Sequence, residues 1–211
     1  MLSRISAACS ENSVTQEFSA EDHRNIYFDK NRVYEHSKFR IHYTTYDVQR
    51  EQDVINLRTH SDIMLLGDID SSDSTTGHTT HLYRYAQVLG IFHVYERHRA
   101  MTSTAWSEKQ QIEILWVHWF RINSSQASGW TAARLPAVTF IMDDADGTNS
   151  YGFMNPQDVI RSAHIIPAFD SDVIGTDFLD DSTRRSVAHS HKENEESGRE
   201  NFDYGCYYVN M

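Results

Sequence analysis

The sequence predicts a mainly β protein, built as a small, bent antiparallel barrel with one short helical turn and disordered termini. Several segments alternate polar residues with β-branched or aromatic ones, as half-buried strands do. Turn-forming residues separate these segments, and only one stretch carries a helix-start signal. With 39% hydrophobic residues, ten Phe and eleven Tyr, the 211-residue chain has enough apolar surface for one core.

The strand signals begin at residue 39, where FRIHYTTYDV alternates in polarity. The strongest signal is YRYAQVLGIFHVY at 83–95, in which Gly90 predicts a bulge or a sharp bend. The segment IEILWVHWFR at 112–121 is typical of a buried strand with its two tryptophans on opposite faces. The two segments should form an antiparallel hairpin with a long tip.

The later signals complete the predicted barrel. The strand AVTFIM at 137–142 is followed by the turn DDADG, across which residues 151–154 should pair back. Asn155 and Pro156 have the pattern of a helix N-cap followed by proline at the first helical position. We therefore expect one helical turn over residues 156–161, and extended structure again at 164–169.

The chain divides into four predicted regions. Residues 1–37 form a flexible lead, 38–169 the barrel domain, 170–203 an acidic disordered linker, and 204–211 a C-terminal edge strand or tail. The lead and the linker are polar and show no sustained period, which is why we expect little order in them.

Charge and cysteine content exclude several classes of protein. The net charge of -11 argues against direct non-specific DNA binding. The excess of acidic residues lies in the two flanking parts of the chain, whereas the middle part has equal numbers of acidic and basic residues. Cys9 and Cys206 cannot supply a disulfide framework. No apolar run suits a membrane span or a signal peptide, so an intracellular location is expected.

The acidic cluster near residue 145 is better explained as a turn than as a calcium loop. A loop that begins at Asp144 would place Asn149 where a glycine is needed and Asn155 where a bidentate glutamate is needed. Asp143, Asp144 and Asp146 are the residue types that a hairpin turn demands. The chain also has no nucleophile elbow and no phosphate-binding glycine loop.

Histidines are numerous, and the pairs His78 with His81 and His189 with His191 have spacings that could share a metal. They sit in polar segments without supporting ligands, so we interpret them as loop histidines. We expect no catalytic residue, no metal and no cofactor.

Asp47 and Asp62 lie beside good strand signals. With the loop histidines, they leave open a rival hypothesis, a metal-dependent hydrolase or nuclease.

The aromatic residues are the best candidates for a binding surface. Rings gathered on a small barrel can form a cage for a cation or a platform for a base, while the alternative is that they fill the core. The candidates are Tyr83, Tyr85, Trp116, Trp119 and Trp130.

Six strings in this order carry a family resemblance: YTTYDVQREQDVINLRTHSDIMLL, YAQVLGIFHV, ILWVHWF, GWTAARLPAVTF, YGFMNPQDVIRSAHIIPAF and the closing YYVNM. Together they resemble the C-terminal region of fungal Plavaka-type transposases, relatives of the CACTA and Kyakuja-Dileera-Zisupton elements. The resemblance covers about residues 40–169 and the last few positions. The barrel pattern is also similar to SH3-like and bromo-adjacent-homology barrels, by analogy only.

The resemblance implies an accessory domain. The acidic catalytic core of such transposases lies upstream of this region, so no catalytic residue is carried over. A transposon-derived, nuclear module that binds a protein, chromatin or the transposase core is the implied function. A decayed remnant without a selected function is the other possibility that the resemblance leaves open.

Overall fold

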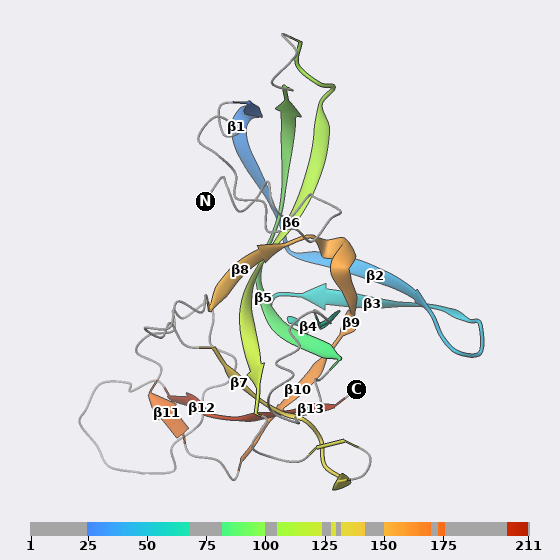
Figure 1. The fold of residues 1–211 in the computed structure, drawn as a ribbon, viewed down its shortest axis with the longest axis vertical. Helices are drawn as coiled ribbons and strands as arrows, with labels where there is room; N and C mark the ends of the chain where they lie inside the picture. The colour runs from blue at the N-terminus through green and yellow to red at the C-terminus, as the bar shows by residue number, and fades with distance from the viewer. Residues whose placement is uncertain are drawn as a thin grey trace, which may run out of the picture.

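The computed structural model describes residues 25–67, 82–99, 105–123, 128–129, 132–141, 150–169, 173–175 and 202–210. These residues form a mainly antiparallel β structure with almost no helix, and the largest sheet curls into a nearly closed barrel (Figure 1). The predicted fold class is confirmed. No helix among the described residues has the length and apolar character to cross a membrane.

The strands follow one another in chain order. They are β1 (Ile26–His36), β2 (Lys38–Thr44), β3 (Arg50–Asn56), β4 (Asp62–Leu66), β5 (Tyr83–His98), β6 (Gln110–Ile122), β7 (Ala137–Phe140), β8 (Tyr151–Met154), β9 (Val159–Ser162), β10 (His164–Pro167), β11 (Val173–Gly175), β12 (Phe202–Tyr204) and β13 (Tyr207–Asn210). A 3-10 turn, η2 (Pro156–Asp158), precedes β9.

Strands β4, β5 and β6 form a central sheet that is buried on both faces. Because side chains alternate along a strand, neighbouring residues enter two different clusters, as Tyr85 and Ala86 do. The hairpin-side core lies under the β2–β3 hairpin and comprises Ile55, Ile63, Leu65, Ala86, Val88, Ile91, Leu115, Val117, Met154 and Val159. The barrel core on the other face comprises Tyr85, Phe120, Val138, Phe140, Ile165, Tyr207 and Val209.

One kinked segment brings the two edges of the barrel sheet together. The strand order is β10-β13-β7-β6-β5-β4-β9, and only Ala163 separates β9 from β10 in the sequence. The Ala163 amide donates to the carbonyl of Asp62 at 2.9 Å, where the segment leaves β4 and turns toward β13. A single chain segment therefore forms both edges, which nearly closes the barrel without a long unpaired strand.

The expected pairing of residues 151–154 with 137–142 is wrong. Both β7 and β8 pair with β6 instead, β8 against Leu115–His118 and β7 against Phe120–Ile122. At Trp119 the backbone amide donates to Ser150 and the carbonyl accepts from Ile141, so the change of partner falls on that one residue. The long, bent strand β6 is long enough to pair with both short strands. The turn residues between the two short strands did not indicate this shared partner.

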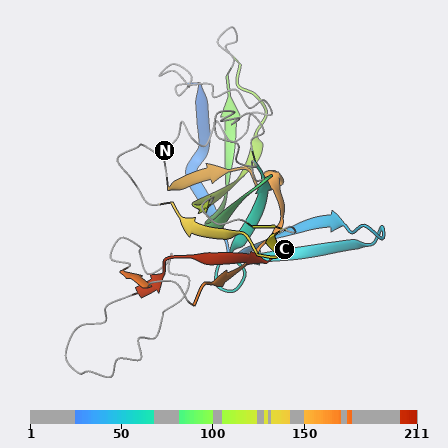
Figure 2. The ribbon, with the colours of Figure 1, turned by 60° about the horizontal axis from the view of Figure 1, so that its bottom comes forward.

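The predicted C-terminal edge strand is an inner strand. β13 lies between β10 and β7 in the sheet (Figure 2), and its residues Tyr207 and Val209 are buried in the barrel core. Part of the predicted disordered linker is also ordered, since β11 and β12 pair antiparallel. The rest of residues 170–203 lies outside the described residues.

The predicted flexible lead contains a strand. β1 pairs antiparallel with the C-terminal half of β5, so the β domain begins at Ile26 and not at residue 38. A register shift between Phe28 and Val33, with Lys30 and Asn31 at positive φ, breaks the alternation that would have revealed the strand. Residues 1–24 lie outside the described residues.

Two local predictions are confirmed. The register of β5 against β6 shifts between Val88 and Gly90, as a bulge at this glycine requires. The side chain of Asn155 caps η2 by accepting from the amide of Gln157 at 3.0 Å. The turn is shorter than expected, because the chain is already extended at Val159.

Candidate functional site

The structure does not gather the predicted aromatic residues into one site. Tyr85 is fully buried in the barrel core, and burial raises its pKa to about 12. Tyr83 packs on the same core, while Trp119 packs on the hairpin-side core under the guanidinium of Arg84, 4.4 Å from its ring centroid. Trp116 lies beside Tyr151, and Trp130 lies outside the described residues. Tyr83, Tyr85 and Trp119 therefore serve as packing, while Trp116 is half-buried beside Tyr151.

The two acids of the rival hypothesis lie apart. Asp47 is exposed in the turn of the β2–β3 hairpin, where it accepts from Thr45, and Asp62 is buried at the start of β4. Within the described ranges, no three His, Cys, Asp or Glu residues lie close enough to hold a metal ion together. The pairs at 78 and 81 and at 189 and 191, and the acids at 143–146, lie outside those ranges, as does Cys9.

A different set of rings lies together on an arm. We define the arm as β1 with the adjoining parts of β5 (92–98) and β6 (110–114); it projects beyond the other described strands in both views (Figures 1 and 2). One face of the arm packs through Val94, Ile112 and Ile114. The opposite face carries rings that we call the ring track, of which Tyr27, Tyr34, His36 and Trp106 are exposed and His93 and Tyr95 are half-buried.

Strand pairing explains why these rings share a face. Tyr34 is opposite His93 in the β1–β5 ladder, and residues two apart on a strand point the same way, which brings His36 and Tyr95 to the same side. The ring of His93 stacks on Tyr34 at 4.7 Å. On its other side it lies edge to edge with His36, whose ring centroid is 4.8 Å away, and we call the three rings the ring column. Tyr95 meets the column edge-on.

The outer end of the track is the most exposed. Tyr27 and Trp106 make an edge contact at 6.0 Å, and their side chains are 49% and 42% exposed. Tyr34 is 38% exposed. Several large rings that stay exposed together on a projecting sheet are uncommon at a protein surface. Such a cluster indicates a contact site.

The column contains a histidine pair. The Nε2 of His36 and the Nδ1 of His93 share a hydrogen bond of 2.6 Å, so one ring must donate and the other accept. Burial, and then the neighbouring His36, lowers the pKa of His93, while Glu113 opposes the shift. The hydrogen bond leaves one of the two bridging nitrogens without a proton.

We expect His93 to titrate below the usual histidine value of 6.5. Its folded pKa lies below the unfolded one, so its contribution to stability is complete above about pH 6.5 and is lost as the pH falls through the folded value. NMR titration of the imidazole checks this directly. His36→Ala should move the midpoint upward and Glu113→Gln should move it downward; shifts in the opposite directions would refute the assignment.

Basic side chains accompany the rings. The Nζ of Lys109 lies 4.1 Å from the centre of the Tyr95 ring and 2.7 Å from the Asp29 carboxylate. That hydrogen bond holds the pKa of Asp29 below its usual value. Arg99 lies over Trp106 at 5.2 Å, and Arg97 is opposite Tyr27 in the ladder. The described residues as a whole are nearly balanced in charge, so the acidic excess of the chain lies outside them.

A groove lies at the foot of the arm, where β1 gives way to β2. We call it the foot groove; it has a volume of about 570 Å³. The ring-column residues His36 and His93 line one part of it, and the exposed side chains of β2 line another. Those β2 side chains are Lys38, Arg40 and His42.

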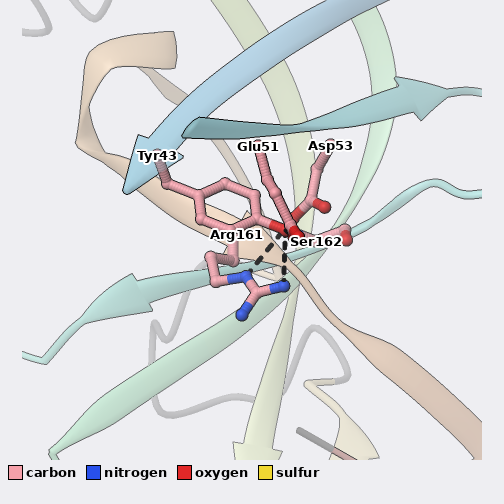
Figure 3. A network of polar contacts seen from close by, with 5 residues as sticks. All are labelled: Tyr43, Glu51, Asp53, Arg161 and Ser162. Carbon is pink, nitrogen blue, oxygen red and sulfur yellow. Dashed lines mark hydrogen bonds and ion pairs between the residues drawn. The ribbon is translucent and has the colours of Figure 1, made fainter. Parts of the chain in front are cut away.

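A polar network fixes the β2–β3 hairpin, and with it the wall of the foot groove (Figure 3). The guanidinium of Arg161, on β9, lies 4.1 Å from the Tyr43 ring, donates to its hydroxyl at 2.9 Å and meets Asp53 at 3.5 Å. The Ser162 amide donates to Asp53 at 3.0 Å. Tyr43 in turn donates to Glu51 at 2.9 Å, which raises the pKa of the Tyr43 phenol.

Asp53→Ala should lower the free energy of unfolding by about 1 kcal/mol, chiefly through the lost backbone hydrogen bond. The ion pair with Arg161 adds little, because the arginine is half exposed. Urea unfolding measures the change, and Gln52→Ala is the matched control, since the neighbouring Gln52 is exposed. Equal costs for the two variants would show that the hairpin is held by its apolar contacts alone.

A second groove, of about 670 Å³, lies between the turn before β4 and the kink at Ala163. Its floor is part of a buried polar row across the central sheet, in which Asp62 is opposite Gln87 and Gln87 is opposite His118. His118 bonds the carbonyl of Ile141 at 3.0 Å and stacks between Phe140 and Tyr151. The row therefore places one buried polar side chain of each central strand side by side.

Comparisons with protein-family models, with curated proteins and with solved structures find no match to this chain.

Sequence reasoning missed the ring track because half of it lies in the segment expected to be loose. The usable signal was local: Tyr34 and His36 are two apart, as are His93 and Tyr95, so each pair must share a face once its segment is a strand. The predicted rings all come from the segments expected to form the barrel, and large rings in such segments are the ones that fill a small core.

Proposed function

We propose that this chain is a non-catalytic binding module of transposon origin that contacts its partner through the ring track. The observation that carries the proposal is the exposure of Tyr27, Tyr34 and Trp106 together on a sheet face that no other described element covers. Large rings at the edge of a rigid sheet provide contact area with little loss of side-chain entropy.

The biological setting follows from the family resemblance of the sequence. It favours a nuclear module that works beside a transposase core, another protein or chromatin. The arm supports this setting because it is separate from the two cores, so its contact face can vary without loss of the fold. The separation of Asp47 from Asp62 gives the hydrolase hypothesis no support.

A binding screen tests the proposal. The purified chain is presented with histone peptides, with DNA and with a transposase catalytic core, and each arm of the screen is repeated with the double variant Tyr34→Ala/Trp106→Ala. Tyr46→Ala is the matched control, because Tyr46 is a fully exposed ring in the turn of the β2–β3 hairpin, away from the track.

The expected result is a partner whose binding weakens at least tenfold in the double variant and stays unchanged in the control, since central interface rings each contribute more than about 1 kcal/mol. Binding that is equal in all three proteins would place the contact elsewhere. Silence in every arm of the screen would favour a scaffold or a decayed remnant.

A further inference from the structure

The charged side chains beside the ring track indicate the sign of its partner's charge. Lys109 already lies over the ring of Tyr95, and Arg99 over the ring of Trp106. The positions that a cationic partner would take over these rings are therefore held by the protein's own cations. A methyl-lysine or basic histone tail is repelled here, whereas an anionic partner is attracted.

Cations continue from the outer end of the track to the foot groove. Arg97, Arg99 and Lys109 lie along the arm, and Lys38 and Arg40 line the groove at its foot. Of the acids on this path, Asp29 is paired with Lys109, while Glu108 is exposed and Glu113 lines the foot groove, so the five cations outnumber the unpaired acids. Rings with cations at intervals along a sheet face form the pattern that holds a single strand by its bases and its phosphates.

The ring column gives a specific place for a base. His93 stacks on Tyr34 and is hydrogen-bonded edge to edge to His36, which is exposed and lines the foot groove. A base that enters the groove can stack on the ring of the exposed His36. The groove volume of about 570 Å³ is sufficient for one nucleotide, and Lys38 and Arg40 line the same space for its phosphate.

The overall charge of -11 does not oppose this partner at the track. The described residues are nearly balanced in charge, and long-range repulsion from the rest is screened beyond about 10 Å at 0.1 M salt. The expectation that DNA binding is unlikely rested on the whole-chain charge, which the folded arm does not share.

We infer that the ring track and the foot groove bind single-stranded nucleic acid, with one base stacked on His36. This inference rests on the proposed function, because it names the partner class of the same surface. It requires no base-specific contact, since every base offers a face for stacking.

Fluorescence anisotropy with labelled oligo(dT) and oligo(rU) of about 15 nucleotides tests it, over a series of salt concentrations. We expect binding of at least one strand that weakens with salt. His36→Ala should weaken it about tenfold through lost stacking, and Arg40→Gln should reduce the salt slope by about 0.7. The controls Tyr46→Ala and Arg50→Gln, exposed residues at the turn and on β3, should leave it unchanged.

Circular dichroism of each variant checks that the fold is retained, which surface substitutions should not disturb. Absence of binding at low salt up to about 100 μM protein, or equal binding by His36→Ala and its control, would overturn the inference. A free mononucleotide that competes as strongly as the oligonucleotide would also overturn it, because the track beyond the groove would then contribute nothing.

The same variants separate this inference from the proposed function. If the strands fail to bind while a protein partner still requires Tyr34 and Trp106, the binding-module proposal stands and the nucleic-acid partner is rejected. If neither a strand nor a protein requires the track, both proposals fall.

Discussion

Replacing Tyr207 by Ala should lower the free energy of unfolding by about 3 to 5 kcal/mol, as truncation of a large buried ring in a core does. The ring is fully buried in the barrel core and makes edge contacts with Phe120 at 6.1 Å and Phe140 at 5.7 Å. It also fixes β13, which joins β10 to β7. The substitution therefore removes packing and loosens the strand that links the two sides of the barrel.

Urea unfolding followed by tyrosine and tryptophan fluorescence measures this cost. Tyr208→Ala is the matched control, because Tyr208 is the next residue on the same strand and is only partly buried. We expect the control to cost less than half as much. Similar costs for the two variants would contradict the position of β13 inside the sheet and would restore the edge-strand interpretation.

Leu115→Ala should cost about 2 to 5 kcal/mol, the range for a fully buried leucine whose cavity cannot collapse. Leu115 has no exposed surface, lies in the hairpin-side core, and is paired with Ile91 on β5 and Met154 on β8. Gln111→Ala, an exposed position on the same strand, should change stability by less than about 0.5 kcal/mol.

Both core variants should lower the midpoint temperature of the same single unfolding transition. Both clusters use β4, β5 and β6, so neither core can unfold while the other remains intact. Calorimetry of Tyr207→Ala and Leu115→Ala should each show a single peak at a lower temperature. A variant that splits the peak into two would show that the two cores are separate cooperative units.

Much of the fold follows from the sequence, because two-residue periodicity and turn chemistry are local. The alternation predicted over residues 39–48 indicated β2, although the strand ends at Thr44 and the chain then turns. The apolar run from Tyr83 indicated β5, and Asn155 indicated the cap of η2. Strand partners are not local. The two halves of β6 take different neighbours, and β13 enters the sheet from the far end of the chain, which no short window of sequence contains.

The site was harder to predict than the fold for a related reason. A ring is buried or exposed according to what covers its strand, and that depends on which strands pair. Trp119 and Tyr85 looked like surface candidates but are packed between strands, while Tyr34 looked like part of a loose lead until β1 paired with β5. Composition gives the number of rings available, and topology decides which of them remain exposed.

Hydroxyl-radical footprinting of the free chain and of the chain bound to its partner shows which rings the partner covers. We expect Tyr34, Tyr95 and Trp106 to become protected on binding, while the exposed Tyr46 in the hairpin turn reacts as before. If these three rings stay as reactive as in the free protein, the ring track is not the contact surface.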